Sequence, residues 1–164
     1  MLVCKFGGTS MADASSISQV VSIINANPKR KIVVVSAPGK LKDQDKVTDM
    51  LINCYKTAKE GSCKDIFEKV KARYQSIIDD LKIDIDLSQE FENIRKEIDS
   101  GAGYDYAASR GEYLMAMILA KYMGFVFLDA KDIIKFTQDG VFESELTNDL
   151  TKAALDPKIG RAHV

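Results

Sequence analysis

The chain has 164 residues with 23 lysines and arginines against 24 aspartates and glutamates, and 46% of its residues are hydrophobic. This length and composition fit one ordinary globular domain. No basic stripe indicates a nucleic-acid partner, and no apolar run approaches the ~20 residues that a membrane-spanning helix needs. The single histidine, His163, lies at the end of the chain, which leaves little room for Ser-His or Cys-His catalysis or for histidine zinc sites. Any chemistry must use lysine, arginine, carboxylates, hydroxyls and backbone groups.

The N-terminus and the cysteines indicate a cytoplasmic protein. Lys5 interrupts the first apolar run after four residues, so the apolar core of a signal peptide is missing. Cys4, Cys54 and Cys63 are odd in number and form no C-x-x-C pair, which is typical of reduced thiols. We expect Cys4 and Cys54 to pack in the interior.

The first 36 residues predict a strand, a helix and a second strand. Residues 2–6 form a short apolar run, and residues 11–25 carry apolar side chains at helical spacing, with Ser16 and Gln19 as a capping box. Residues 31–36 are β-branched without alternation, as in a strand buried on both faces. We therefore expect a βαβ unit with two parallel strands.

The turn after the first strand has the composition of a phosphate-binding loop. Residues 5–10 read Lys-Phe-Gly-Gly-Thr-Ser, and glycines before a helix let backbone N–H groups approach an anion closely. The lysine precedes the glycines, so the turn is neither a Walker A loop nor a dinucleotide fingerprint. A plain turn with a surface lysine is the alternative. Because ligands of parallel sheets bind outside the carboxyl ends of the strands, this turn and the loop at 36–39 are expected to face one site.

Residues 46–122 are predicted to be mostly helical. Apolar stripes at residues 47–58, 66–81, 87–98 and 107–122 indicate four helices packed into a core, with Gly61, Gly101 and Gly124 at helix ends. Residues 125–129 follow as a buried strand. Asp139-Gly140 is a turn signal between two segments that can pair as a hairpin.

A second motif, Ala-Ser-Arg-Gly-Glu at residues 108–112, lies at the start of the last long helix. Gly111 costs helix stability of about 1 kcal/mol relative to alanine, so it indicates a close backbone approach. Glu112 is a candidate ligand-binding carboxylate, although a carboxylate near a helix start also simply favours the helix dipole. Arg110 is taken as structural.

Three motifs together resemble one enzyme family. Residues 5–10, 33–37 and 109–112 are similar in order and spacing to the motifs of aspartate kinases, members of the amino-acid-kinase superfamily. The resemblance covers residues 1–158, with Met11 where the family usually has valine. It implies an α/β fold, a three-layer α/β/α sandwich with a mainly parallel sheet.

The resemblance also implies roles for individual residues. The first motif corresponds to the ATP phosphate site, with Lys5 as the catalytic cation. The aspartate site corresponds to three positions in other motifs, of which Glu112 receives the α-ammonium group. The ATP-phosphate residues are Lys5, Phe6, Gly7, Gly8, Thr9 and Ser10, and the aspartate residues are Ser36, Thr48 and Glu112.

The implied activity is phosphorylation of the side-chain carboxylate of L-aspartate by ATP with Mg²⁺, the first step of lysine, threonine and methionine biosynthesis. A carboxylate nucleophile with a pKa near 4 is ionised at neutral pH and needs no general base, which agrees with the scarcity of histidine. No protein residue is expected to hold a metal, and the full-length protein is expected to form a homo-oligomer. Another acyl-phosphate-forming amino-acid kinase and a non-catalytic binding or regulatory protein stay open as alternatives.

The resemblance does not extend to the whole of an aspartate kinase. The family continues with a second glycine-rich segment, the nucleotide-base site and ACT regulatory domains, none of which is present in these residues. We expect residues 1–158 to be the N-terminal portion of the catalytic domain and inactive by itself. Residues 159–164, Ile-Gly-Arg-Ala-His-Val, can be read as translated sequencing adapter, with natural residues as the alternative.

Overall fold

A parallel sheet runs through the molecule. The computed structural model of the chain describes residues 1–155 and 162–163, and the sheet has the strand order β1-β2-β4-β3. All of its strand pairs are parallel. The predicted α/β fold with a parallel sheet is therefore confirmed. The strands are β1 (Leu2–Phe6), β2 (Arg30–Val35), β3 (Val126–Phe127) and β4 (Ala162–His163).

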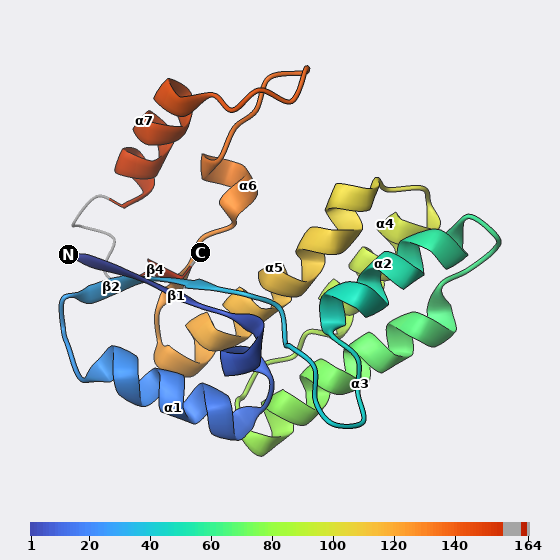
Figure 1. Ribbon diagram of the computed structural model, residues 1–164, viewed down its shortest axis with the longest axis horizontal. Coiled ribbons are helices and arrows are strands. Elements are labelled where there is room, and N and C mark those ends of the chain that lie inside the picture. The colour runs from blue at the N-terminus through green and yellow to red at the C-terminus, as the bar shows by residue number, and fades with distance from the viewer. Residues whose placement is uncertain (156–161, 164) are drawn as a thin grey trace.

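Helices make up most of the remaining structure. Figure 1 shows α1 and α5 beneath the sheet, a cluster of α2, α3 and α4 to one side, and α7 rising on the other side of the sheet. None of the described helices has the length and apolar character required to cross a bilayer. The helices are η1 (Gly8–Met11), α1 (Ala14–Asn25), α2 (Val47–Ala58), α3 (Lys64–Asp80), α4 (Ser88–Asp99), α5 (Tyr104–Met123), α6 (Ala130–Ile133) and α7 (Ser144–Ala154).

The βαβ unit forms as predicted, with a different helix start. β1 pairs in parallel with β2, and α1 connects them. The expected capping box at Ser16 is wrong, because the carboxylate of Asp13 accepts a hydrogen bond from the Ser16 backbone N–H at 2.8 Å and caps the helix. Residues 8–11 form the separate helical turn η1, so α1 begins only at Ala14. Its N-cap is Asp13, three residues before the predicted Ser16.

The two faces of the sheet differ in cover. Val33 and Val35 of β2 belong to the hydrophobic core, and Ile32 on the opposite face is also buried, so β2 is buried from both sides as predicted. On β1, however, Val3 is 63% exposed and Lys5 is exposed. The core lies on the face covered by α1 and α5.

The predicted helical stripes form that core, with shifts at helix ends. Gly124, at a φ of +66°, ends α5 in the left-handed conformation as expected. Gly61 is not the C-cap of α2, which is Lys59. α5 begins at Tyr104 rather than near Ala107, because Gly103 supplies the extended residue that precedes the helix.

The region after α5 is less regular than expected. The predicted strand at 125–129 shortens to two residues at the edge of the sheet, and Val126 is 45% exposed rather than buried. The predicted reversal at Asp139-Gly140 is present, with Gly140 at a φ of +78° and one antiparallel bridge between Phe136 and Phe142. Helices α6 and α7, on either side of this hairpin, were not predicted.

The cysteines only partly follow expectation. Cys54 is fully buried as predicted. Cys4 is only half-buried, because it lies on β1 at the edge of the sheet. Cys63 is fully buried instead. Burial raises the pKa of the Cys54 thiol and raises that of Cys63 to about 11, so both thiols stay protonated and act as packing groups.

The tail assigned to adapter sequence is described only in part. Residues 159–161 and 164 lie outside the described residues. Ala162 and His163 form β4, which pairs through its backbone with β2 and β3. Because such pairing uses backbone groups that every residue carries, it is compatible with either origin of the tail.

Candidate active site

Several of the predicted site residues line one cleft at the carboxyl ends of β1 and β2. The cleft has a volume of about 360 Å³. It brings together the turn after β1, the loop after β2, the start of α2 and the third turn of α5. Its lining residues are Gly8, Thr9, Ser36, Ala37, Pro38, Gly39, Lys40, Lys46, Thr48 and Glu112.

Backbone hydrogen bonds hold the two loops of the cleft against each other. The Ser36 N–H donates to the Phe6 carbonyl at 3.0 Å, and the Gly39 N–H donates to the Gly8 carbonyl at 2.8 Å. A Cβ on Gly39 would lie 2.7 Å from the Gly8 oxygen, which is closer than two such atoms can approach. Glycine at position 39 is therefore required for this contact. The expectation that both loops face one site is confirmed.

Thr48 reaches the cleft from the first turn of α2. The Val47 N–H donates to the Pro38 carbonyl at 3.1 Å, so the start of α2 is tied to the loop after β2. The positive end of the helix dipole at this terminus favours negative charge nearby. A hydroxyl and a helix terminus thus face the same space as Ser36.

Glu112 closes the cleft from α5. Its Oε1 accepts a hydrogen bond from the Ala37 N–H at 3.2 Å, although the two residues are 75 positions apart. A Cβ on Gly111 would lie 2.6 Å from the Cβ of Ala37. The close backbone approach predicted at Gly111 is therefore confirmed, and it places the Glu112 carboxylate beside the loop after β2.

Other residues of the first motif do not line this cleft. Lys5 is exposed, and its Nζ lies 3.9 Å from the position that a Cβ on Gly7 would occupy, so the ammonium group lies over the glycine turn. Phe6 is half-buried and packs against the core. Ser10 donates its backbone N–H to the Gly7 carbonyl at 2.9 Å within the turn. Lys5, Phe6, Gly7 and Ser10 therefore flank the cleft.

Two cleft lysines were missed by the motif analysis. Lys40 directly follows the loop after β2, and Lys46 precedes Thr48 by two residues. Both are exposed. Their closeness in sequence to the predicted residues was the available signal. With Lys5 over the neighbouring turn, they add positive charge to a cleft whose lining also includes the Glu112 carboxylate.

Two buried residues of α3 hydrogen-bond to the segments that form the cleft, and the motif analysis missed both. Arg73 and Tyr74 are 5% and 0% exposed. Arg73 donates hydrogen bonds to the loop after β2, and Tyr74 donates one to the backbone of α5. Burial raises the pKa of the Tyr74 hydroxyl well above its ordinary value, and the nearby Glu112 charge adds to this, so the hydroxyl remains a donor.

Arg110 has no place in the main cleft. Its guanidinium stacks between the rings of Tyr106 and Tyr113, at 4.7 and 4.6 Å from their centroids. It also donates to the Ser109 hydroxyl at 3.1 Å. These contacts fit the structural role expected for Arg110.

The described residues offer no ready-made cage for a metal ion. Among residues 1–155 and 162–163, no three histidine, cysteine, aspartate or glutamate side chains come together. A divalent cation that accompanies a nucleotide keeps several waters and binds mainly through phosphate oxygens.

The cleft lies at the carboxyl ends of β1 and β2 in a parallel α/β sheet, and Glu112 contributes a carboxylate to its lining. Residues 1–158 match the model of the amino acid kinase family. The chain belongs to the amino acid kinase family.

Within this family the chain is similar to aspartate kinases. It is 44% identical over 85 residues to Aspartokinase 3 of Bacillus subtilis, an alignment that covers 51% of this chain and 19% of that protein. The structure of Clostridium acetobutylicum aspartate kinase matches with a TM-score of 0.93 and 39% identity, over 98% of this chain and 37% of that one. The chain thus spans little more than a third of the clostridial enzyme.

More distant structures share the fold. Escherichia coli aspartokinase III in complex with aspartate and ADP matches 98% of this chain and 39% of its own, with a TM-score of 0.79 at 17% identity. At this identity the match shows the common architecture only.

Proposed function

We propose that residues 1–158 are the N-terminal portion of the catalytic domain of an aspartate kinase, which transfers the γ-phosphoryl group of ATP to the side-chain carboxylate of L-aspartate. One observation carries the proposal: the turn Gly8-Thr9, the hydroxyls of Ser36 and Thr48, and the Glu112 carboxylate line a single cleft. The similarity to the clostridial aspartate kinase, at 39% identity over 98% of this chain, supports aspartate as the substrate.

In this proposal the positive side of the cleft binds the phosphates of ATP. Backbone N–H groups of the turn and the hydroxyls of Thr9 and Ser10 surround the phosphates, and Phe6, Gly7 and Gly8 supply the turn itself. Lys5 lies over the turn and stabilises charge on the transferring oxygens. Lys40 and Lys46, which line the cleft, add further positive charge.

Glu112 binds the amino acid on the other side of the cleft. Its carboxylate, which is held by the Ala37 N–H, pairs with the α-ammonium group of aspartate. Ser36 and Thr48 donate hydroxyl hydrogen bonds to the substrate carboxylates. The side-chain carboxylate of aspartate is then directed toward the phosphates, and positioning and charge stabilisation supply the rate enhancement.

Substitution of the two charged residues tests this division of labour in the full-length polypeptide. We expect Lys5→Ala to lower kcat by about 10²–10³-fold, because it removes a charge that acts on the transition state. We expect Glu112→Gln to raise the KM for aspartate by about 10–100-fold and to leave the KM for ATP nearly unchanged, because only the ammonium partner is lost. Coupled detection of ADP release measures both. Unchanged turnover in Lys5→Ala would remove that residue from the reaction.

The alternative activities are separated by substrate and by turnover. A panel of amino acids with carboxylate side chains, tested for ADP release, distinguishes aspartate from the substrates of other acyl-phosphate-forming kinases. Ligand binding without turnover in the full-length polypeptide would favour a binding or regulatory protein.

The same proposal extends to the remainder of the polypeptide. Residues 159–164 are translated adapter, and a catalytic remainder and ACT domains follow residue 158 in the gene. Sequencing of the genomic locus tests this, since a natural stop codon after Val164 would contradict it. We further propose a cytoplasmic homo-oligomer, which light scattering on the full-length protein tests for its oligomeric state.

A further inference from the structure

Two consecutive residues of α3 hydrogen-bond from the interior to two different segments that contribute residues to the cleft. Arg73 and Tyr74 are both buried, and neither lines the cleft. Figure 1 shows α3 beside α1 and beneath the loop that follows β2. Consecutive side chains of a helix point about 100° apart, so one rigid helix can reach two different segments at once.

Arg73 ties together the two loops on the phosphate side. Its Nη2 donates to the Ala12 carbonyl at 2.7 Å and to the Gly39 carbonyl at 3.1 Å, and its Nη1 donates to the side chain of Gln44. Ala12 follows η1, whereas Gly39 lies in the loop after β2. A planar guanidinium with fixed donor directions therefore sets the separation of these two backbone segments.

Tyr74 fixes the backbone on the Glu112 side. Its hydroxyl donates to the Gly111 carbonyl at 2.7 Å. That carbonyl and the N–H of Glu112 belong to the same planar peptide unit, so the hydrogen bond holds the peptide from which the Glu112 side chain extends. The Tyr74 ring packs on Phe91, with 6.3 Å between centroids, which fixes the position of the hydroxyl.

Burial of the charged Arg73 side chain carries a desolvation cost in free energy. Replacement of buried charged groups by apolar ones is often neutral or stabilising, so stability alone does not favour an arginine here. Within the part of the chain that the structure describes, Nε of Arg73 has no hydrogen-bond partner. The side chain thus leaves one buried donor unpaired while its other contacts all go to the loops around the cleft.

We propose that Arg73 and Tyr74 are positioning residues that set the distance between the phosphate half and the Glu112 half of the cleft. The proposal rests on the proposed function for the identity of the two substrates. Arg73 acts on the nucleotide side through Gly39 and Gly8, and Tyr74 acts on the amino-acid side through Gly111 and Glu112.

Kinetics of single variants in the full-length polypeptide test the division. We expect Tyr74→Phe, which removes only the hydroxyl, to raise the KM for aspartate by about threefold to tenfold with the KM for ATP unchanged. We expect Arg73→Lys to raise the KM for ATP and lower kcat by about tenfold, and Arg73→Met to lower kcat further, because lysine keeps the charge but not the two-pronged contact. Val70→Ala, a fully buried position one turn earlier on α3, is the control for lost stability.

Hydrogen exchange of two amides tests the positioning independently of activity. The Ala37 N–H is bonded to Glu112, and the Gly39 N–H is bonded to Gly8. Tyr74→Phe should speed exchange at Ala37 more than at Gly39, and Arg73→Lys should do the reverse. Val70→Ala should change both equally.

The outcomes separate this inference from the proposed function. Equal changes at both amides in all three variants, or unchanged KM values with only a lower melting temperature, would overturn the positioning role. A wild-type protein without aspartate-dependent ADP release would reject the proposed function, and the exchange pattern would still decide the positioning role.

Discussion

At the scale of single residues, the shape of the cleft depends on two glycines, Gly39 and Gly111, whose surroundings leave no space for a Cβ. Gly111 packs against Ala37, and Gly39 packs against Gly8, at distances that exclude a Cβ. Both contacts bring backbone N–H groups next to a polar partner: Ala37 next to Glu112, and Gly39 next to the Gly8 carbonyl. Close backbone packing thus positions the polar groups.

Gly111→Ala tests this packing. A Cβ placed 2.6 Å from the Ala37 Cβ must push α5 away from the loop, and overpacking of this kind costs about 1–3 kcal/mol. We expect a matching loss in the free energy of unfolding, measured by urea denaturation, and a raised KM for aspartate in the full-length polypeptide.

Gly103→Ala is the matched control for Gly111→Ala. Gly103 lies just before the same helix at a φ of −67°, and a Cβ there meets no atom of the described chain within 4 Å. It should leave both stability and kinetics nearly unchanged. Equal effects of the two substitutions would show that steric contact with Ala37 is not the cause.

Sequence motifs identified the residues that belong to short contiguous patterns. Ser36 and Glu112 each lie in such a pattern, and the cleft contains both. Arg73 lies in no pattern, since its partners Ala12 and Gly39 are 61 and 34 positions away. A buried arginine on an amphipathic helix is indistinguishable in sequence from an exposed one. Only tertiary structure reveals it.

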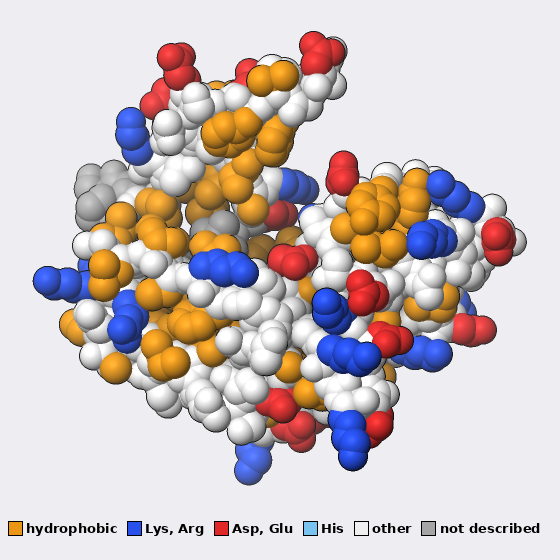
Figure 2. All heavy atoms as spheres, in the orientation of Figure 1, with side chains coloured by type: hydrophobic (Ala, Val, Ile, Leu, Met, Phe, Trp, Pro, Cys, Tyr) orange, Lys and Arg blue, Asp and Glu red, His pale blue; other side chains and the backbone are white. Residues whose placement is uncertain are grey.

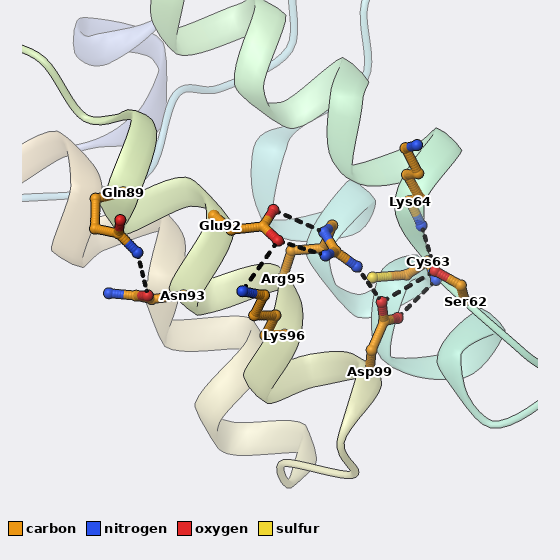
Figure 3. Close-up of polar contacts among 9 residues, drawn as sticks. All are labelled: Ser62, Cys63, Lys64, Gln89, Glu92, Asn93, Arg95, Lys96 and Asp99. Atoms are coloured by element: carbon orange, nitrogen blue, oxygen red, sulfur yellow. Dashed lines mark hydrogen bonds and ion pairs between the residues drawn. The ribbon is translucent and has the colours of Figure 1, made fainter.

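At the scale of secondary structure, Asp99 links two helices. It is the last residue of α4, and its Oδ1 accepts the Cys63 N–H at the start of α3 at 2.8 Å. Its Oδ2 accepts from the Ser62 hydroxyl at 3.0 Å and from Arg95 at 2.6 Å (Figure 3). Burial raises the pKa of this carboxyl, but the hydrogen bonds from Cys63 and Ser62 and the Arg95 charge outweigh it and lower the pKa below its ordinary value.

The effect of Asp99→Asn on stability should depend on pH. A carboxyl whose folded pKa lies below its ordinary value of 3.8 contributes stability above that value, and the contribution is lost as the pH falls through the folded pKa. We expect a loss of about 1–2 kcal/mol in the free energy of unfolding near pH 6, comparable to a helix cap, and a smaller loss near pH 3.

Asp149→Asn serves as the comparison for Asp99→Asn. The Asp149 side chain is 80% exposed, and its pair with Lys152 spans 3.9 Å, so its removal should have little effect at either pH. Urea denaturation at both pH values measures the difference. A loss for Asp99→Asn that is independent of pH would contradict the capping role.

The segment from α6 to α7 is the least packed part of the described chain. Figure 1 shows it extending away from the sheet and the other helices, and Figure 2 shows hydrophobic side chains gathered along it. Its exposed apolar residues are Ile134, Phe136, Val141, Phe142 and Leu146.

Limited proteolysis should therefore cut this segment first. Chymotrypsin is expected to cleave after Phe136 or Phe142, which are 59% and 50% exposed, before it cleaves at the buried Phe67 or Phe91. Mass spectrometry of a time course identifies the sites. Early cleavage within α3 or α4 would contradict this order of stability.

The regular apolar spacing of the long helices made them predictable, whereas the elements that follow α5 were missed or placed wrongly. α3 and α4 carry regular apolar stripes and lie within a few residues of their predicted positions. α7 was not predicted, although Leu146, Leu150 and Ala154 recur at helical spacing; its one buried residue is Thr147. The two residues of β3 pair at the edge of the sheet, and such pairing depends on distant strands rather than on local sequence.

At the scale of the whole molecule, parallel pairing of β1 and β2 explains why the cleft is where it is. The register places Phe6 beside Val35, so both chains leave the sheet at the same edge. The turn with Gly8 and the loop with Ser36 then meet there, and α2 and α5 bring Thr48 and Glu112 to them. The described residues form this cleft, in a chain that spans 37% of the clostridial aspartate kinase.

The most direct test of the central claim is to trap the product. An acyl phosphate reacts with hydroxylamine to give a hydroxamate, so the full-length polypeptide is incubated with ATP, Mg²⁺, L-aspartate and hydroxylamine. We predict aspartyl hydroxamate that depends on both substrates and is strongly reduced in Lys5→Ala and Glu112→Gln. Absence of hydroxamate with a folded wild-type protein, or yields from Lys5→Ala and Glu112→Gln equal to the wild-type yield, would contradict the assignment of this cleft to phosphoryl transfer onto aspartate.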